Sequence, residues 1–213
     1  VNPSRGLGDV YKRQVVVKDT FYVNEGDTLT VLNSDIDLII NNDIDPDNLT
    51  SELSAQLMIP PSYHSGIFGI GSKGAFQYIH NCNDADVDVF QYLVSDGTAT
   101  SSFQDSVIIF ILNEAPFGEP DFYSVQNGQT LTVDELSGAL SNDLDSNSCD
   151  VLRVKLVQPP SYHLGSFTLD STGAFSYIHD GTLTPTQDYF VYQLSDGEDS
   201  AIETDTVYIT INN

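Results

Sequence analysis

The sequence predicts an all-β protein built from two tandem β-sandwiches of about seven strands each. First, the chain repeats itself: PPSYHSGIF begins at Pro60, and PPSYHLGSF begins at Pro159. Second, apolar residues alternate with polar ones, as at Val207, Ile209 and Ile211, which is the period of a half-buried strand. Third, no segment longer than a turn or two has helical periodicity. Short alternating strands separated by turn residues are typical of sandwiches.

Both copies contain the same predicted elements in the same order. With copy one first, these are opening strands at Asp19 and Asp121, TLTV at Thr28 and Thr130, GAFQYIH at Gly74 and GAFSYIH at Gly173, VFQYLVSDG ending at Gly97 and YFVYQLSDG ending at Gly197, and closing strands from Asp105 and Asp205. Each Asp-Gly pair follows a strong strand and predicts a hairpin in which glycine supplies a positive φ. The closing strand of copy one is apolar on both faces, so we expect it to be either covered or an adhesive sheet edge.

Repeat boundaries divide the chain into three parts. Residues 15–113 form the first predicted sandwich and residues 114–213 form the second, with two prolines stiffening the connection. Residues 1–14 differ from the rest, and GDVYKRQ resembles the translation of a transposon-end adapter. We therefore expect a non-native tail on a fragment of a longer protein, the alternative being a genuine basic tail.

Composition excludes several classes of function. The 7 basic and 31 acidic residues give a net charge of −24, which disfavours binding to nucleic acid. No apolar run is long enough to span a membrane in this fragment. The two cysteines, Cys82 and Cys149, stand at non-equivalent places in the repeats. A bridge would have to join one repeat to the other, so we expect two free or partly buried thiols.

An acidic loop, Asn42–Asp47, returns in altered form as Asn142–Asn147. In copy one, three aspartates alternate, so an extended backbone would place them on one side. Their repulsion favours a hard cation, and calcium accepts six to eight oxygen ligands in loose geometry. The alternative is a solvated loop with Asx turns. Copy two keeps two of the three aspartates, so we expect its site to be weaker or missing.

The order of these elements resembles the tandem cadherin-like, immunoglobulin-like repeats of large bacterial surface proteins and adhesins. The features that carry the resemblance are the Asp-x-Tyr/Phe opening, the TLTV strand, the NDxDxD loop, PPSYHxGxF, GxFxY, FxYxxSDG, and the closing VxIxI with Asn-x-Ala-Pro. The resemblance implies calcium bound by the loop, the linker and the opening aspartate. Carried onto this chain, the implied ligands are Asp19, Asp43, Asp45, Asp47, Asn113, Glu114, Asp121, Asp143 and Asp145.

The chain lacks familiar catalytic motifs, and its histidines fall into repeat-matched pairs, which indicates an architectural role. We expect no enzyme. We expect instead a calcium-stabilised extracellular spacer or stalk segment of a secreted or surface adhesin-type protein, with neighbouring repeats of the same chain as partners. The alternative is a β-sandwich module that binds a surface glycan or protein through an aromatic cluster on one open face.

Overall fold

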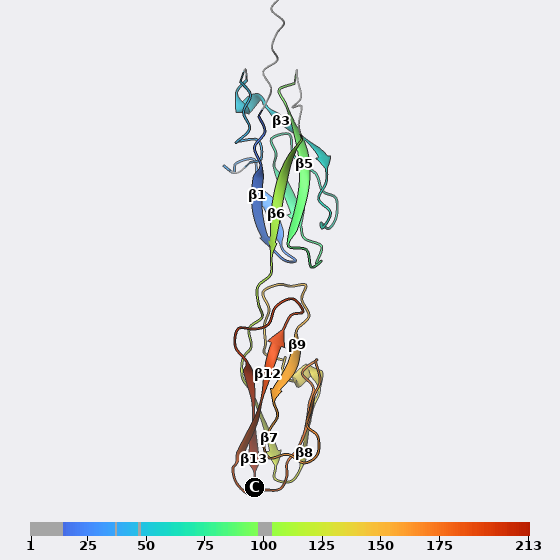
Figure 1. The fold of residues 1–213 in the computed structure, drawn as a ribbon, viewed down its shortest axis with the longest axis vertical. Coiled ribbons are helices and arrows are strands. Elements are labelled where there is room, and N and C mark those ends of the chain that lie inside the picture. Colours follow the sequence, from blue (N-terminus) through green and yellow to red (C-terminus); the bar gives the residue numbers. More distant parts are fainter. Residues whose placement is uncertain (1–14, 37, 47, 98–103) are drawn as a thin grey trace, which may run out of the picture. The chain divides into compact units, whose positions relative to one another are not determined.

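The computed structural model describes residues 15–36, 38–46, 48–97 and 104–213. The predicted tail, residues 1–14, lies outside them, as does Asp47. The chain divides into two compact units (Figure 1). Unit 1 ends at Leu112, and unit 2 spans Asn113–Asn213. Both are all-β, which confirms the predicted fold class.

Unit 1 contains six strands among its described residues. They are β1 (Asp19–Asn24), β2 (Thr28–Val31), β3 (Ser54–Ile59), β4 (Phe76–Ile79), β5 (Val87–Ser95) and β6 (Asp105–Leu112), with a single 3-10 turn, η1 (Thr50–Glu52). One sheet has the order β1-β6-β5-β3, and β2 pairs with β4 in the other. The seventh predicted strand is reduced to a single bridge between Ile70 and Phe76.

Unit 2 repeats this arrangement with all seven strands. They are β7 (Asp121–Gln126), β8 (Thr130–Val133), β9 (Arg153–Gln158), β10 (Thr168–Leu169), β11 (Phe175–Ile178), β12 (Gln187–Ser195) and β13 (Asp205–Asn212), with the 3-10 turn η2 (Glu135–Ser137). The sheets have the orders β7-β13-β12-β9 and β10-β11-β8. In each unit the first strand pairs in parallel with the last, and Asp121 lies opposite Val207.

Each unit has its own apolar core, filled from both of its sheets. In unit 2, Phe175 from β11 contacts Phe190 from β12 edge to face, with ring centroids 5.1 Å apart. Phe76 and Phe90 make the same contact in unit 1 at 5.1 Å. Such pairs favour one arrangement of the two sheets because tilted rings interlock.

Two sequence-based expectations can be compared with the structure. Of the two outcomes expected for the closing strand of copy one, β6, the structure favours the covered strand, because β6 lies between β1 and β5 and not at a sheet edge. Its second face is partly covered by Tyr22, which stacks on Phe110 at 5.5 Å. The expectation of free or partly buried thiols is wrong, since Cys82 and Cys149 are both disulfide-bonded. The comparison of the two repeats predicts only the features that both repeats share, so it could not predict the state of cysteines that each occur in one repeat.

Candidate metal centre

The acidic loops turn alternate side chains away from solvent. In unit 2, Asp143 is 7 % exposed while the neighbouring Leu144 is 66 % exposed. Leu144 also forms an isolated backbone bridge to Phe117 in the segment that precedes β7. This bridge fixes the local extended backbone, so Asp143 and Asp145 point inward as the alternation predicts. They nevertheless belong to two different clusters.

The first cluster surrounds the hydroxyl of a buried tyrosine. Tyr192 Oη lies 3.0 Å from Asp143 Oδ2, 3.0 Å from the carbonyl oxygen of Ala139 and 3.4 Å from Asp121 Oδ2. A phenol carries one proton, so it satisfies one of these three acceptors at a time. Burial raises the pKa of Asp121 to about 7 and that of Asp143 to about 6, and the charge of Asp205 adds to both shifts. A shared proton or a cation would relieve the repulsion.

Unit 1 contains the same cluster. Tyr92 Oη lies 2.8 Å from the Ile39 carbonyl oxygen, 3.0 Å from Asp19 Oδ2 and 3.2 Å from Asp43 Oδ2. Burial raises the pKa of Asp19 to about 7 and that of Asp43 to about 6. The structure therefore brings together the opening aspartate and the first loop aspartate in both repeats, as the implied ligand set requires.

The second cluster gathers three carboxylates at the linker end of unit 2. Asp145, Asp150 and Asp196 each offer an oxygen atom, and these atoms lie within 4.8 Å of one another. Asp145 Oδ1 accepts a hydrogen bond from the Asn147 backbone at 2.8 Å. Its Oδ2 is buried and has no hydrogen-bond partner. Burial raises the pKa of Asp145, and the charge of Asp196 adds to this effect.

A linker residue completes this group. Asn113 Nδ2 donates to Asp196 Oδ2 at 3.2 Å, and Asn113 Oδ1 is buried without a hydrogen-bond partner. Glu114 instead contributes its backbone N–H, which donates to Asn147 Oδ1 at 2.8 Å, while its own side chain is exposed. The three carboxylates, one of which has an unsatisfied oxygen, form an all-oxygen donor set that suits calcium, and Asn113 contacts this set through its amide N–H.

The equivalent place in unit 1 is arranged differently. Asp45 Oδ1 accepts from the Asn48 backbone at 3.1 Å, and Asn48 Nδ2 donates to Asp96 Oδ2 at 3.0 Å. The amide that contacts the hairpin aspartate thus comes from the loop itself, whereas in unit 2 it comes from the linker residue Asn113. Among the described residues, which omit Asp47, the three-carboxylate group occurs in the second repeat alone.

Two members of the group, Asp150 and Asp196, were not among the ligands implied by the sequence. Asp196 lies in the Asp-Gly hairpin turn, where its Oδ1 accepts backbone N–H bonds from Glu198 and Asp199. That turn role explains the residue locally, so its local pattern offered no reason to place it beside Asp145. Asp150 follows Asp145 in the same loop but outside the repeated motif. The sequence did contain one signal for these two residues, since an acid-rich loop and an acidic hairpin turn occur in the same repeat.

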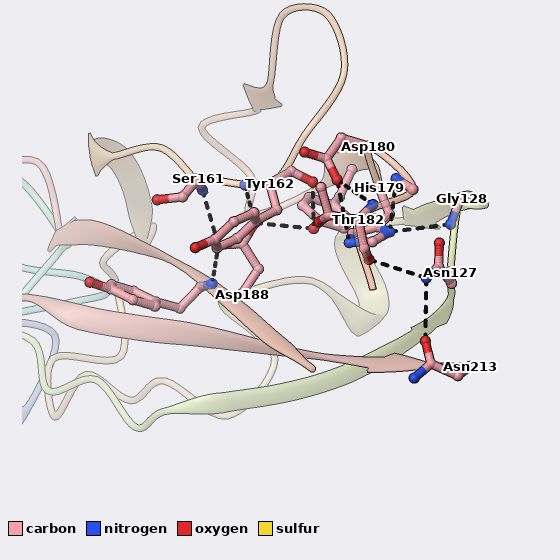
Figure 2. A network of polar contacts seen from close by, with 12 residues as sticks. Asn127, Gly128, Ser161, Tyr162, His179, Asp180, Thr182, Asp188 and Asn213 are labelled. Carbon is pink, nitrogen blue, oxygen red and sulfur yellow. Dashed lines mark hydrogen bonds and ion pairs between the residues drawn. The ribbon is translucent and has the colours of Figure 1, made fainter. Parts of the chain in front are cut away.

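His179, one of the repeat-matched histidines, and Asp188 serve the architecture of unit 2, as Figure 2 shows. The Nδ1 atom of buried His179 accepts backbone N–H bonds from Gly128 at 3.2 Å and Gly181 at 3.3 Å. Asp188, 2 % exposed, accepts backbone N–H bonds from Ser161 at 3.0 Å and Tyr162 at 2.8 Å. The Asp188 contacts hold the PPSYH segment against the sheet, and the His179 contacts join two backbone turns.

Comparisons with known proteins identify both units. Residues 113–213 match the bacterial cadherin-like domain family, and residues 12–109 match the bacterial Ig domain family. Domains of these families are typically non-enzymatic structural modules. A comparison with curated protein sequences found no match.

Solved structures that match this chain include animal cadherins. Drosophila N-cadherin EC1-3 is 11% identical, with a TM-score of 0.49, and the match covers 92% of this chain and 63% of that one. Drosophila N-cadherin EC1-4 is 16% identical over 94% of this chain and 50% of its own, with a TM-score of 0.41. Human mucin-like protocadherin EC1-2 is 14% identical over 94% and 98%, with a TM-score of 0.39. The chain thus spans about half the length of the N-cadherin EC1-4 structure.

Proposed function

The chain belongs to the tandem cadherin-like and immunoglobulin-like repeats of bacterial surface proteins, and on that premise we propose that it is a calcium-stabilised extracellular spacer. The observation that carries the proposal is the group formed by Asp145, Asp150 and Asp196. Buried oxygens of Asp145 and Asn113 that lack hydrogen-bond partners lie in a chain of net charge −24. Without a cation, such oxygens cost free energy because nothing replaces the water they lose on burial.

Calcium would act on the segment that leads into unit 2. Asn113 is the first residue of that unit, whereas Asp145, Asp150 and Asp196 come from two of its loops. An ion shared by these residues would tie the linker to the loops and replace repulsion between carboxylates by attraction. A restrained linker is what a spacer needs, because the angle at each joint determines how far a string of domains extends.

One further feature supports an extracellular location. Both cysteines are disulfide-bonded, and disulfides persist mainly in oxidising compartments. Helices long and apolar enough to cross a membrane are absent from the described part of the chain. Within the proposal, the partners of this segment are neighbouring repeats of the same protein.

We expect calcium to raise the melting temperature of chelator-treated protein, with the rise depending on Asp145. Sites in extracellular modules often bind calcium at about 10⁻⁴ to 10⁻³ M. At ten times the dissociation constant, one site adds about 1.4 kcal/mol. Calorimetric melts at increasing calcium concentration measure this rise. Asp145→Asn should remove most of it, because the amide keeps the Asn147 bond through its oxygen but loses the charge.

Asp45→Asn is the matched comparison in unit 1. The described residues of unit 1 hold no group of three carboxylates like that around Asp145, so this substitution should leave most of the calcium-induced rise intact. Superimposable melts in chelator and in calcium would refute the proposal. A calcium effect that survives Asp145→Asn unchanged would place the ion elsewhere in the chain.

A further inference from the structure

The outer face of the sheet β7-β13-β12-β9 carries a row of aromatic side chains. Tyr208 on β13 lies directly opposite Phe122 on β7 and Tyr189 on β12. The Phe122 and Tyr208 rings are 5.5 Å apart and nearly parallel, and the Tyr189 and Tyr208 rings are 6.4 Å apart. Phe122 is 73% exposed and Tyr189 is 43% exposed. The sheet core does not need these rings, since the opposite face supplies it.

The same face carries the positively charged Lys and Arg side chains of unit 2. Arg153 and Lys155 are the two basic residues between Asn113 and Asn213, and both are exposed on β9 around the buried Val154. The other outward positions of the four strands hold aliphatic, hydroxyl and amide side chains, such as Gln193 and Thr210, and no acid. The strands thus gather the Lys and Arg residues of a strongly acidic unit on one face whose outward strand positions hold no acid.

We propose that this face binds an anionic polysaccharide. A sugar ring has an apolar C–H face that packs on an aromatic ring, while its hydroxyls need the amide and hydroxyl partners that surround the row. Lys155 lies opposite Gln193, four residues along β12 from Tyr189, which is about 14 Å in a strand. A ligand that reaches both the aromatic row and the cations is therefore an extended chain of several sugars with acidic groups.

Charge complementarity favours this ligand over a nucleic acid. Double-stranded DNA carries one charge per about 1.7 Å, and two cations cannot offset the repulsion of so dense a polyanion by the acidic remainder of the unit. A polysaccharide with spaced sulfate or carboxylate groups places its charges near Arg153 and Lys155. One acid, Asp170, is close enough to Arg153 for the two charges to interact. Lys155 is therefore the stronger anion contact.

The experiment compares dextran sulfate with unmodified dextran, which share a backbone, and adds polygalacturonate as a carboxylated polymer. Binding of the full chain is measured by affinity electrophoresis with chelator present, so the result does not depend on the calcium proposal. We expect retardation by at least one anionic polymer and none by dextran. Tyr189→Ala should weaken binding about tenfold. Lys155→Gln should weaken it and flatten its salt dependence.

Tyr22→Ala is the matched control, because Tyr22 is 61% exposed and stacks on Phe110 on the outer sheet of unit 1, whose strands β1, β6, β5 and β3 contain no Lys or Arg. It should leave binding unchanged. Three results would overturn the proposal: neither anionic polymer is bound, Tyr189→Ala and Lys155→Gln bind as well as the parent, or DNA is bound equally well. A dimer in sedimentation that Tyr189→Ala dissociates would also overturn it, since a second copy would then be the occupant.

Discussion

Asp188→Ala should destabilise unit 2 by about 3–5 kcal/mol, the largest effect we expect from one substitution. Asp188 is 2 % exposed and accepts N–H bonds from Ser161, Tyr162 and Tyr189 as well as an O–H bond from Tyr177 at 3.0 Å. Alanine removes the acceptor of the Ser161 and Tyr162 N–H groups in a space closed to solvent, although the Tyr177 hydroxyl keeps the Tyr162 carbonyl oxygen at 3.1 Å. The melting temperature of the unit should fall by more than about 15 °C.

Two matched substitutions test that explanation. Asp88 makes the equivalent bonds in unit 1, to the Ser62 and Tyr63 backbone and to the Tyr78 hydroxyl. Asp88→Ala should therefore destabilise that unit by a similar amount. Asp170→Ala removes an exposed carboxylate whose hydrogen bonds go to Thr172, two residues away. It should change stability by less than about 1 kcal/mol. Equal losses for Asp188→Ala and Asp170→Ala would show that the buried hydrogen bonds are not the cause.

Local pattern was sufficient to predict the strands. Alternation placed Phe190, Tyr192 and Leu194 on one face, and all three are buried. The first repeat shows the same alternation in Phe90, Tyr92 and Val94, and these three residues are also buried. Where the two copies differ, prediction was weaker. The strand β10 in unit 2 is a single bridge in unit 1, because the pairing at Ile70 does not extend.

The candidate site was harder to predict, because its residues come from separate loops. The alternating aspartates Asp84, Asp86 and Asp88 formed one acidic pattern in sequence, yet Asp88 faces inward from β5 and is fully hydrogen-bonded. Asp143 and Asp145 formed another, yet Tyr192 binds the first and the Asp196 group contains the second. The spacing of the aspartates predicts the side of the strand to which each side chain points. Which group each carboxylate contacts depends on residues far away in the sequence.

Metal-free protein should be more stable at pH 5 than at pH 8. Burial raises the pKa of Asp19 and Asp121 to about 7 and that of Asp43 and Asp143 to about 6, from 3.8. A raised folded pKa means that the folded state binds protons more tightly than the unfolded state. The resulting stability is fully present below about pH 4 and is lost as the pH rises through 6 to 7. We expect about 2 kcal/mol per repeat after allowance for solvent screening, measured by urea unfolding in chelator.

Asp121→Asn separates this effect from the other titrating groups. The amide imitates the protonated carboxyl, and its oxygen can still accept the hydroxyl proton of Tyr192, which lies 3.4 Å from Asp121 Oδ2. The variant should therefore be more stable than the parent at pH 8, and its stability should change less between pH 8 and pH 5. If the stability of the parent stays constant or falls as the pH is lowered from 8 to 5, the carboxylates of the tyrosine-centred clusters hold their charges in well-solvated positions. The same clusters would then offer no electrostatic reason to bind a cation, which leaves the Asp145 group to account for any calcium effect.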